Sequence, residues 1–167
     1  FSPCYRREGG SHGKDTKGLV RVHEFYKLEQ LVLCEANHAE SVRLHEELNR
    51  NTEEFIESLH LPYRQLAIST GDLKAAHVKS YDTELWVPSE GKYREIASAS
   101  YCHDFQTRRF NIRYDDGGVK RYAHSLNATA IPTPRVLVAL IENNQRADGS
   151  IAIPKALVPY FGKEEIK

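Results

Sequence analysis

Four short stretches of this sequence combine ionisable, aromatic and hydroxyl residues at spacings that could perform chemistry. In the first, Tyr5-Arg6-Arg7-Glu8, strand alternation places Arg6 and Glu8 on one face and Arg7 on the other. An arginine fork donates two hydrogen bonds to phosphate oxygens, and a carboxylate accepts one from an exocyclic amine. The pair could hold the phosphate and the base of one nucleotide. A salt bridge on a solvated strand would give the same pattern.

The second stretch mixes an aromatic residue with ionisable ones. Alternation predicts that five of its side chains share a face: Arg21, His23, Phe25, Lys27 and Glu29. Phe25 is suited to stacking on a purine, and Glu29 is suited to accepting hydrogen bonds from an ammonium group. The competing interpretation is a core phenylalanine surrounded by charges at the rim of the sheet.

The third stretch, Glu95-Ile96-Ala97-Ser98, places a carboxylate and a hydroxyl among small residues on a strand. Oxygen ligands suit Mg²⁺, which needs few protein ligands when phosphates supply the others. This pattern predicts a magnesium position on Glu95 and Ser98. The alternative is a surface glutamate with no ligand.

The fourth stretch ends at Arg135, directly after Pro134 at the first position of a predicted helix. A cation in the first turn opposes the helix dipole, so this placement breaks a local rule. The placement is explained if Arg135 and the helix N-terminus both direct positive potential at a bound phosphate. Otherwise the guanidinium reaches solvent or a carboxylate.

The elements that must position these stretches are strands and two long helices. Alternation and turn residues predict strands at residues 1–8, 19–34, 63–70, 79–87, 93–98, 108–114 and 119–127, with a hairpin turn at 115–118. Asn37 followed by Glu40 predicts the start of an amphipathic helix that ends near Leu61. Thr133 opens a second helix, apolar nearly all round and therefore buried, that runs to about Asn144. The prediction is an α+β fold, an antiparallel sheet flanked by helices.

Composition restricts the classes of partner. The 167 residues suit one domain, and Lys plus Arg (23) balance Asp plus Glu (23), so the chain has no global basic field. No apolar run is long enough to cross a bilayer, so no membrane partner is predicted. The scattered Cys4, Cys34 and Cys102 lack the spacing of a zinc site and predict half-buried thiols in a reducing, cytoplasmic compartment. Because the chain begins at Phe1 and contains no Met, we expect a fragment.

These stretches and the segments between them resemble the class II aminoacyl-tRNA synthetases and, within that class, the seryl-tRNA synthetase family. Ser2–Glu8, Gly10–Gly18 and Arg21–Phe25 resemble motif 2 of the class, and Leu126–Arg135 followed by Leu140–Gln145 resembles motif 3. Four further segments follow in the order of the family: residues 70–72, 81–88, 93–98 and 104–109. The resemblance covers essentially all of residues 1–167 and implies the C-terminal part of a catalytic domain.

The resemblance implies roles for individual residues. Arg6 and Arg135 would be the catalytic arginines, on the α- and γ-phosphates of ATP respectively. The other implied ATP-binding residues are Arg7, Glu8, Val22, Phe25, Glu95, Ile96, Ala97 and Ser98, with Mg²⁺ on Glu95 and Ser98. Serine would be bound by Glu29, Asn127 and Thr129, and the tRNA acceptor end would be contacted by His12, Lys14 and Lys17.

The implied activity is that of a serine–tRNA ligase. Such an enzyme activates L-serine with ATP to seryl-adenylate and transfers the seryl group to the 3′ end of tRNA(Ser), with tRNA(Sec) as a further candidate acceptor. A tRNA-binding coiled coil and the motif 1 dimer segment are expected before Phe1, so we expect the fragment alone to be inactive and the full-length protein to be a cytoplasmic homodimer. Two alternatives remain: a related ligase that loads amino acids onto a carrier protein, and a non-catalytic synthetase paralogue.

Overall fold

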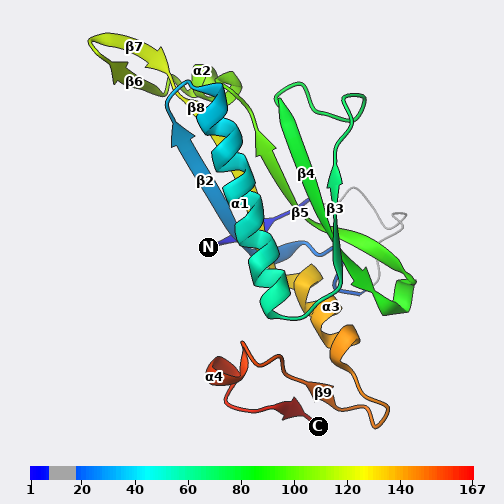
Figure 1. Cartoon of the computed structure of the whole chain (residues 1–167). Coiled ribbons are helices and arrows are strands. Elements are labelled where there is room, and N and C mark those ends of the chain that lie inside the picture. Colours follow the sequence, from blue (N-terminus) through cyan, green and yellow to red (C-terminus); the bar gives the residue numbers. More distant parts are fainter. Residues whose placement is uncertain (8–17) are drawn as a thin grey trace.

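The main body of the molecule is a six-stranded sheet with the strand order β1-β2-β8-β5-β4-β3 (Figure 1). The computed structural model describes residues 1–7 and 18–167. The strands of the sheet are β1 (Ser2–Tyr5), β2 (Glu24–Cys34), β3 (Tyr63–Ala67), β4 (Lys79–Val87), β5 (Lys92–Tyr101) and β8 (His124–Pro132). All neighbouring strands in this sheet are antiparallel, which confirms the predicted α+β fold.

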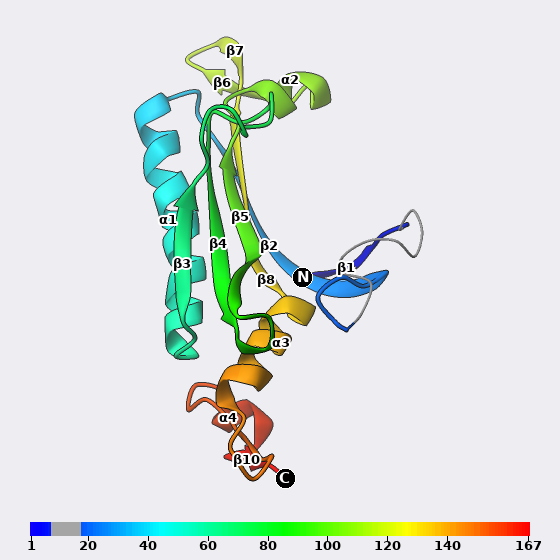
Figure 2. The same ribbon diagram turned by 90° about the vertical axis from the view of Figure 1, so that its right-hand side faces the viewer.

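Two helices pack on the sheet. Helix α1 (His38–Ser58) runs along one face, whereas β1 and the start of β2 bend away from the other (Figure 2). The Asn37 side chain caps α1 as predicted, because its Oδ1 accepts a hydrogen bond from the Glu40 backbone N–H at 3.1 Å. Helix α3 (Thr133–Asn144) begins where predicted, directly after β8. It is less buried than predicted, since Leu137 is 45% exposed.

The core consists of two groups of buried side chains. One group joins the end of α1 to α3 and to the strands between them: Ile56, Leu59, Leu61, Leu85, Ile96, Ala97, Val136, Ala139 and Leu140. The other lies under the middle of α1: Leu48, Ala99, Tyr101, Leu126 and Ala128. The burial of both groups fixes β5 and β8 side by side, so the residues on their other surface have defined positions.

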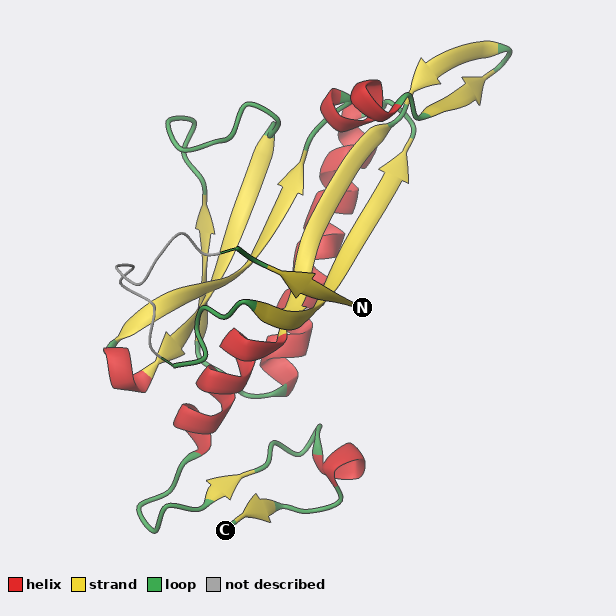
Figure 3. Cartoon of the chain, turned by 180° about the vertical axis from the view of Figure 1, so that it is seen from behind, coloured by secondary structure: helices red, strands yellow, loops and turns green. Residues whose placement is uncertain are grey.

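The remaining elements are short. They are the single-turn helix η1 (Pro88–Glu90), α2 (Phe105–Phe110), β6 (Arg113–Asp116), β7 (Val119–Tyr122), β9 (Ile151–Ala152), α4 (Val158–Phe161) and β10 (Glu165–Ile166). The β6–β7 hairpin projects beyond one end of the sheet, and the segment after α3 lies at the other end (Figure 3). The hairpin turn was predicted correctly: Gly117 and Gly118 have φ of +61° and +92°, as its two central residues require.

Two predicted strands were wrong. Residues 108–110 belong to α2, where Arg108 forms an ion pair with Asp104 at 2.7 Å, four residues earlier, and the helix ends at the left-handed Asn111. The predicted strand 119–127 is divided between β7, which pairs with β6, and β8, which enters the main sheet. Strand alternation did not reveal this change of partner.

Other strand boundaries differ from the predicted ones. The strand predicted from residue 19 begins at Glu24, and Val20 and Val22, which precede it, line a cavity described below. The first strand ends at Tyr5 and the third at Ala67, whereas β5 extends to Tyr101. Cys4, Cys34 and Cys102 are free thiols; the first two are half-buried as predicted, whereas Cys102 is fully buried. None of the described helices is long and apolar enough to span a bilayer.

Candidate active site

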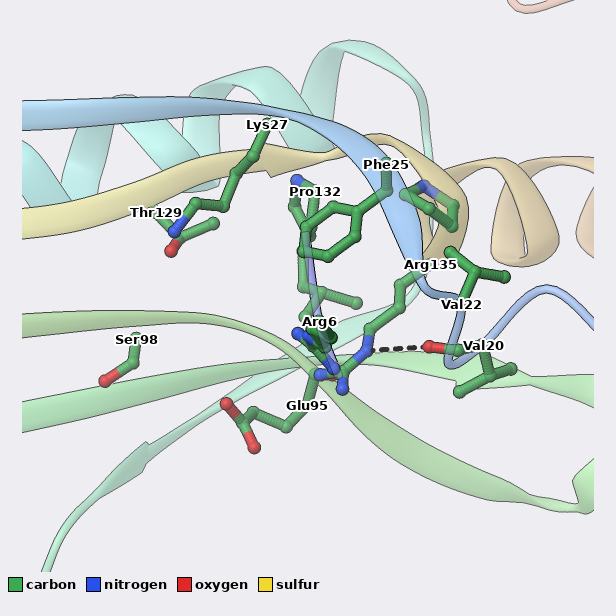
Figure 4. A pocket seen from close by; sticks show the side chains of 12 residues that line it. Arg6, Val20, Val22, Phe25, Lys27, Glu95, Ser98, Thr129, Pro132 and Arg135 are labelled. Atoms are coloured by element: carbon green, nitrogen blue, oxygen red, sulfur yellow. Dashed lines mark hydrogen bonds between the residues drawn. The ribbon is translucent and has the colours of Figure 1, made fainter. Parts of the chain in front are cut away.

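A cavity of about 140 Å³ lies where β2, β8 and β5 meet the first turn of α3 (Figure 4). Its walls come from segments that are far apart in the sequence: Arg6, Val20, Val22, Phe25, Lys27, Glu95, Ile96, Ser98, Thr129, Pro132, Pro134 and Arg135. All four stretches identified in the sequence contribute to it. The fold therefore brings together both predicted catalytic arginines and most of the predicted ATP-binding residues.

Two β-bulges make this arrangement possible. In β5, Thr83 pairs with Ala97 and Glu84 with Glu95, so Ile96 is the extra residue. In β8, Leu28 pairs with Ile131 and Glu29 with Thr129, so Ala130 is the extra residue. Residues three apart on a regular strand point to opposite faces, and a bulge between them returns them to the same face.

The consequence of the bulges is seen in the cavity lining. Glu95 and Ser98, three residues apart on β5, both line the cavity, and so do Thr129 and Pro132 on β8. Without the bulges, one member of each pair would point away from the cavity. The carboxylate and the hydroxyl predicted to hold Mg²⁺ are thereby placed on the same wall.

Arg135 joins three elements at one end of the cavity. Its Nη1 donates to the Glu95 carbonyl at 2.6 Å and its Nε donates to the Val20 carbonyl at 3.2 Å. These carbonyls orient the guanidinium without neutralising its charge. Burial lowers the pKa of Arg135; the Glu95 carboxylate acts against this shift, whereas Arg6, Arg21 and Arg94 add to it.

Arg6 lies close to Arg135 at the same cavity. The Arg6 backbone N–H donates to the His23 carbonyl at 2.7 Å, which fixes the exit from β1 beside the entrance to β2. The guanidinium carbon of Arg6 is 4.9 Å from the centre of the Phe25 ring. The site therefore concentrates positive charge next to an aromatic surface, an arrangement that suits a nucleoside triphosphate.

The oxygen ligands for a divalent ion are few but suitable. Glu95 is the one carboxylate among the described residues that line the cavity, and the Ser98 hydroxyl lies on the same wall. A second cavity of about 210 Å³, next to the first, also has Glu95 and Ser98 in its wall. Within residues 1–7 and 18–167, no group of three or more His, Cys, Asp or Glu side chains is placed to hold a metal. The donor set fits Mg²⁺ that completes its coordination with phosphate oxygens.

A polar group of three residues borders the other end of the cavity. Glu29 Oε2 accepts a hydrogen bond from Thr129 Oγ1 at 2.9 Å and forms an ion pair with Lys27 Nζ at 2.8 Å. The Lys27 amino group points toward the Thr129 hydroxyl in Figure 4. The structure thus places two predicted serine-binding residues, Glu29 and Thr129, in direct contact.

Several predicted residues lie elsewhere. Ala97 is buried in the core, and neither exposed Arg7 nor Asn127 lines the cavity, although Asn127 is two residues from Thr129 on the same face of β8. The predicted residues that lie outside the described part of the chain are Glu8, His12, Lys14 and Lys17.

Four residues of the cavity wall were not predicted: Lys27, Val20, Pro132 and Pro134. The alternation of β2 already placed Lys27 on the face shared by Phe25 and Glu29, so a signal for Lys27 existed. The sequence holds no comparable signal for the two prolines.

The antiparallel sheet and the cavity with two arginines at the start of α3 agree with the class expected from the sequence. The chain belongs to the tRNA synthetase class II core domain family (G, H, P, S and T), whose model matches residues 1–144. More particularly, it is 52% identical over 167 residues to the serine–tRNA ligase of Deinococcus radiodurans, and the match covers 99% of this chain and 39% of that protein. It is 51% identical to the serine–tRNA ligase of Pyrococcus furiosus, with coverage of 99% and 36%.

Solved structures agree with these matches. The seryl-tRNA synthetase from Pyrococcus horikoshii complexed with ATP superposes with a TM-score of 0.92 at 50% identity, covering 98% of this chain and 37% of that one. The cytoplasmic serine–tRNA ligase from Naegleria fowleri in complex with AMP gives a TM-score of 0.91 at 40% identity, with coverage of 99% and 39%. The chain therefore spans less than two fifths of the length of these relatives.

Proposed function

We propose that this chain is the ATP- and serine-binding part of a serine–tRNA ligase. The observation that carries the proposal is the cavity in which Arg6 and Arg135 lie near Arg21 and Arg94, with Glu95 as the one described carboxylate in its wall. Such an excess of positive charge favours a polyanion. The identity of about half of the residues with serine–tRNA ligases supports serine as the partner substrate.

The proposed reaction begins with attack of the serine carboxylate on the α-phosphorus of ATP, which forms seryl-adenylate and releases pyrophosphate. Arg6 holds the α-phosphate and Arg135 the γ-phosphate, so the two cations align the chain of phosphates for in-line displacement. Phe25 stacks on adenine beside Val22, and Glu8 accepts from the adenine amino group. No covalent nucleophile is needed, because positioning and charge stabilisation lower the barrier.

Magnesium has a limited role in this proposal. Glu95 and Ser98 would hold it, and when bound it neutralises charge on the phosphate oxygens. Phosphate oxygens would have to supply its remaining ligands, which agrees with the small donor set of the cavity. Arg135 does not compete with the metal for Glu95, because it contacts the backbone carbonyl of that residue.

Serine recognition is assigned to the group beside Thr129. The Glu29 carboxylate binds the substrate ammonium, and Thr129, with Asn127 nearby on the same face of β8, borders the side chain of the amino acid. In the full-length protein, the seryl group then passes to the 3′ end of tRNA(Ser) or tRNA(Sec). His12, Lys14 and Lys17 contact the acceptor end, and the active form is a cytoplasmic homodimer.

The test is amino-acid-dependent exchange of pyrophosphate into ATP by the full-length protein. Exchange should require serine and should fall by at least a hundredfold in Arg6→Ala, because the variant loses a charge-assisted contact with the reacting phosphate. Arg43→Ala is the matched control, since Arg43 is exposed on α1 and pairs with Glu40 and Glu47. Exchange driven by threonine or alanine, or undiminished in Arg6→Ala, would contradict the proposal. No exchange with any amino acid would favour a non-catalytic paralogue.

A further inference from the structure

The carboxylate assigned to the substrate ammonium is already bound to an ammonium of the chain itself. Lys27 Nζ lies 2.8 Å from Glu29 Oε2, and Thr129 Oγ1 donates to the same oxygen at 2.9 Å. The Lys27 and Glu29 side chains are 29% and 35% exposed, so both are partly removed from water. An incoming ammonium would therefore meet a second positive charge next to its binding group.

Binding of the substrate ammonium to Glu29 without displacement of Lys27 is unfavourable for two reasons. Two ammonium groups on one half-buried carboxylate repel each other, and only one of them can be neutralised by its charge. Lys27 is better suited to leave than Thr129 is, because a lysine head moves on a flexible four-carbon stem whereas a threonine has one torsion. Its stem also starts at the cavity that contains Arg6 and Arg135 (Figure 4).

We propose that Lys27 is a displaceable internal counter-ion of Glu29, an inference that rests on the proposed function. The substrate ammonium takes the place of Lys27 on Glu29, and the released Lys27 moves to the serine carboxylate and the α-phosphate. There it offsets the repulsion between two anions that must approach each other. In the reaction, a bond forms from the serine carboxylate oxygen to the α-phosphorus and the bond to pyrophosphate breaks. Lys27 stays protonated throughout and transfers no proton.

This exchange of partners couples recognition to chemistry. A ligand without an ammonium leaves Lys27 on Glu29, away from the phosphate, so the positive charge is supplied only after an amino acid has bound. The amino acid thus contributes to assembly of the site that activates it. If Lys27 were merely structural, it would stabilise Glu29 in every state. Its removal would then not strengthen the binding of a ligand that has an ammonium group but no carboxylate.

The experiment uses full-length protein and ethanolamine, which has the ammonium and hydroxyl of serine but no carboxylate. In Lys27→Met, calorimetric titration should show ethanolamine binding at least tenfold tighter than in the wild type, because Glu29 is no longer occupied. The maximal rate of serine-dependent exchange should fall at least tenfold, because the cation at the phosphate is lost. Lys27→Arg retains the charge and should bind ethanolamine like the wild type.

Two further variants control for poor folding and for the loss of a lysine outside the cavity. Lys27→Gln should reproduce both effects if Lys27→Met folds poorly, and Lys79→Met, which removes a lysine that pairs with Glu46 outside the cavity, should change neither. Unchanged or weaker ethanolamine binding in Lys27→Met and Lys27→Gln, or an unchanged exchange rate, would overturn the inference. Exchange that depends on another amino acid would instead refute the proposed function, while ethanolamine affinity would still report the competition at Glu29.

Discussion

Replacement of Arg135 by methionine should affect the free protein and its ATP complex very differently. In the free protein, the variant loses hydrogen bonds from a charged donor to the carbonyls of Glu95 and Val20, each with a net contribution of about 1.5 kcal/mol. It also removes a partly buried charge that is repelled by Arg6, Arg21 and Arg94. Because these effects oppose each other, we expect the free energy of unfolding without ATP to change by less than about 2 kcal/mol.

The Arg135→Met variant should lose much more binding free energy in its ATP complex than stability in the free protein. A charge-assisted contact with a phosphate contributes about 1.5–3 kcal/mol, so the Kd for ATP should rise roughly 10- to 150-fold. At an ATP concentration of about 100 times the wild-type Kd, ligand binding stabilises the fold by about 2.7 kcal/mol. A hundredfold rise in Kd would reduce this stabilisation to about 0.4 kcal/mol.

The assay is urea denaturation of the full-length protein with and without ATP, combined with titration calorimetry. Arg146→Met is a matched control, because Arg146 forms an ion pair with Glu165 in the segment after α3 and lies outside the cavity. The reasoning would be refuted if Arg135→Met lost more than about 4 kcal/mol without ATP while its Kd for ATP stayed unchanged. That result would mean that Arg135 serves the fold and not the nucleotide.

Three further outcomes are expected. Phe25→Leu should raise the Kd for ATP about 3- to 10-fold by loss of stacking, with serine binding unchanged in calorimetry; an equal loss for both ligands would point to a general disruption. Asn37→Ala should lower the free energy of unfolding in urea by about 1 kcal/mol and Asn37→Asp by much less, because the aspartate still caps α1; equal losses would contradict the capping role. Burial lowers the pKa of three histidines in the folded protein, His45, His77 and His124. Because the unfolded chain binds protons more readily at these histidines, their contribution to the free energy of unfolding is complete above about pH 6.5 and is lost as the pH falls through the lowered folded-state pKa values. Melting temperatures between pH 8 and 5 should fall accordingly, and a flat profile would exclude this linkage.

Local rules predicted the features that are decided by neighbours in the sequence. The cap at Asn37, the start of α3 at Thr133 and the turn at Gly117 each depend on a few adjacent residues, and each was confirmed. Arg135 is instructive in another way. Its position opposes the helix dipole, and this broken local rule pointed to the cavity that the structure contains.

The features that the sequence did not predict, the helix at residues 105–110 and the two bulges, depend on contacts that a local pattern does not report. Arg108 sits in a segment whose residues suit a strand, but its ion pair with Asp104 favours a helical turn. The placement of Glu95 and Ser98 on one wall contradicts simple alternation, and the prediction that both hold Mg²⁺ rested on their oxygen atoms, not on their spacing. A bulge is set by the pairing of two strands, so a single strand's composition does not reveal it.

The two unpaired residues, Ile96 and Ala130, have a consequence for protein design. Each shifts the alternation of its strand by one residue, so that the cavity-lining side chains before and after it share one surface. A designer who copied the side chains of this site onto an ideal sheet, in the same order but without these insertions, would divide the site between its two surfaces. Ala130 contributes no wall to the cavity, yet a transplanted site would have to include it.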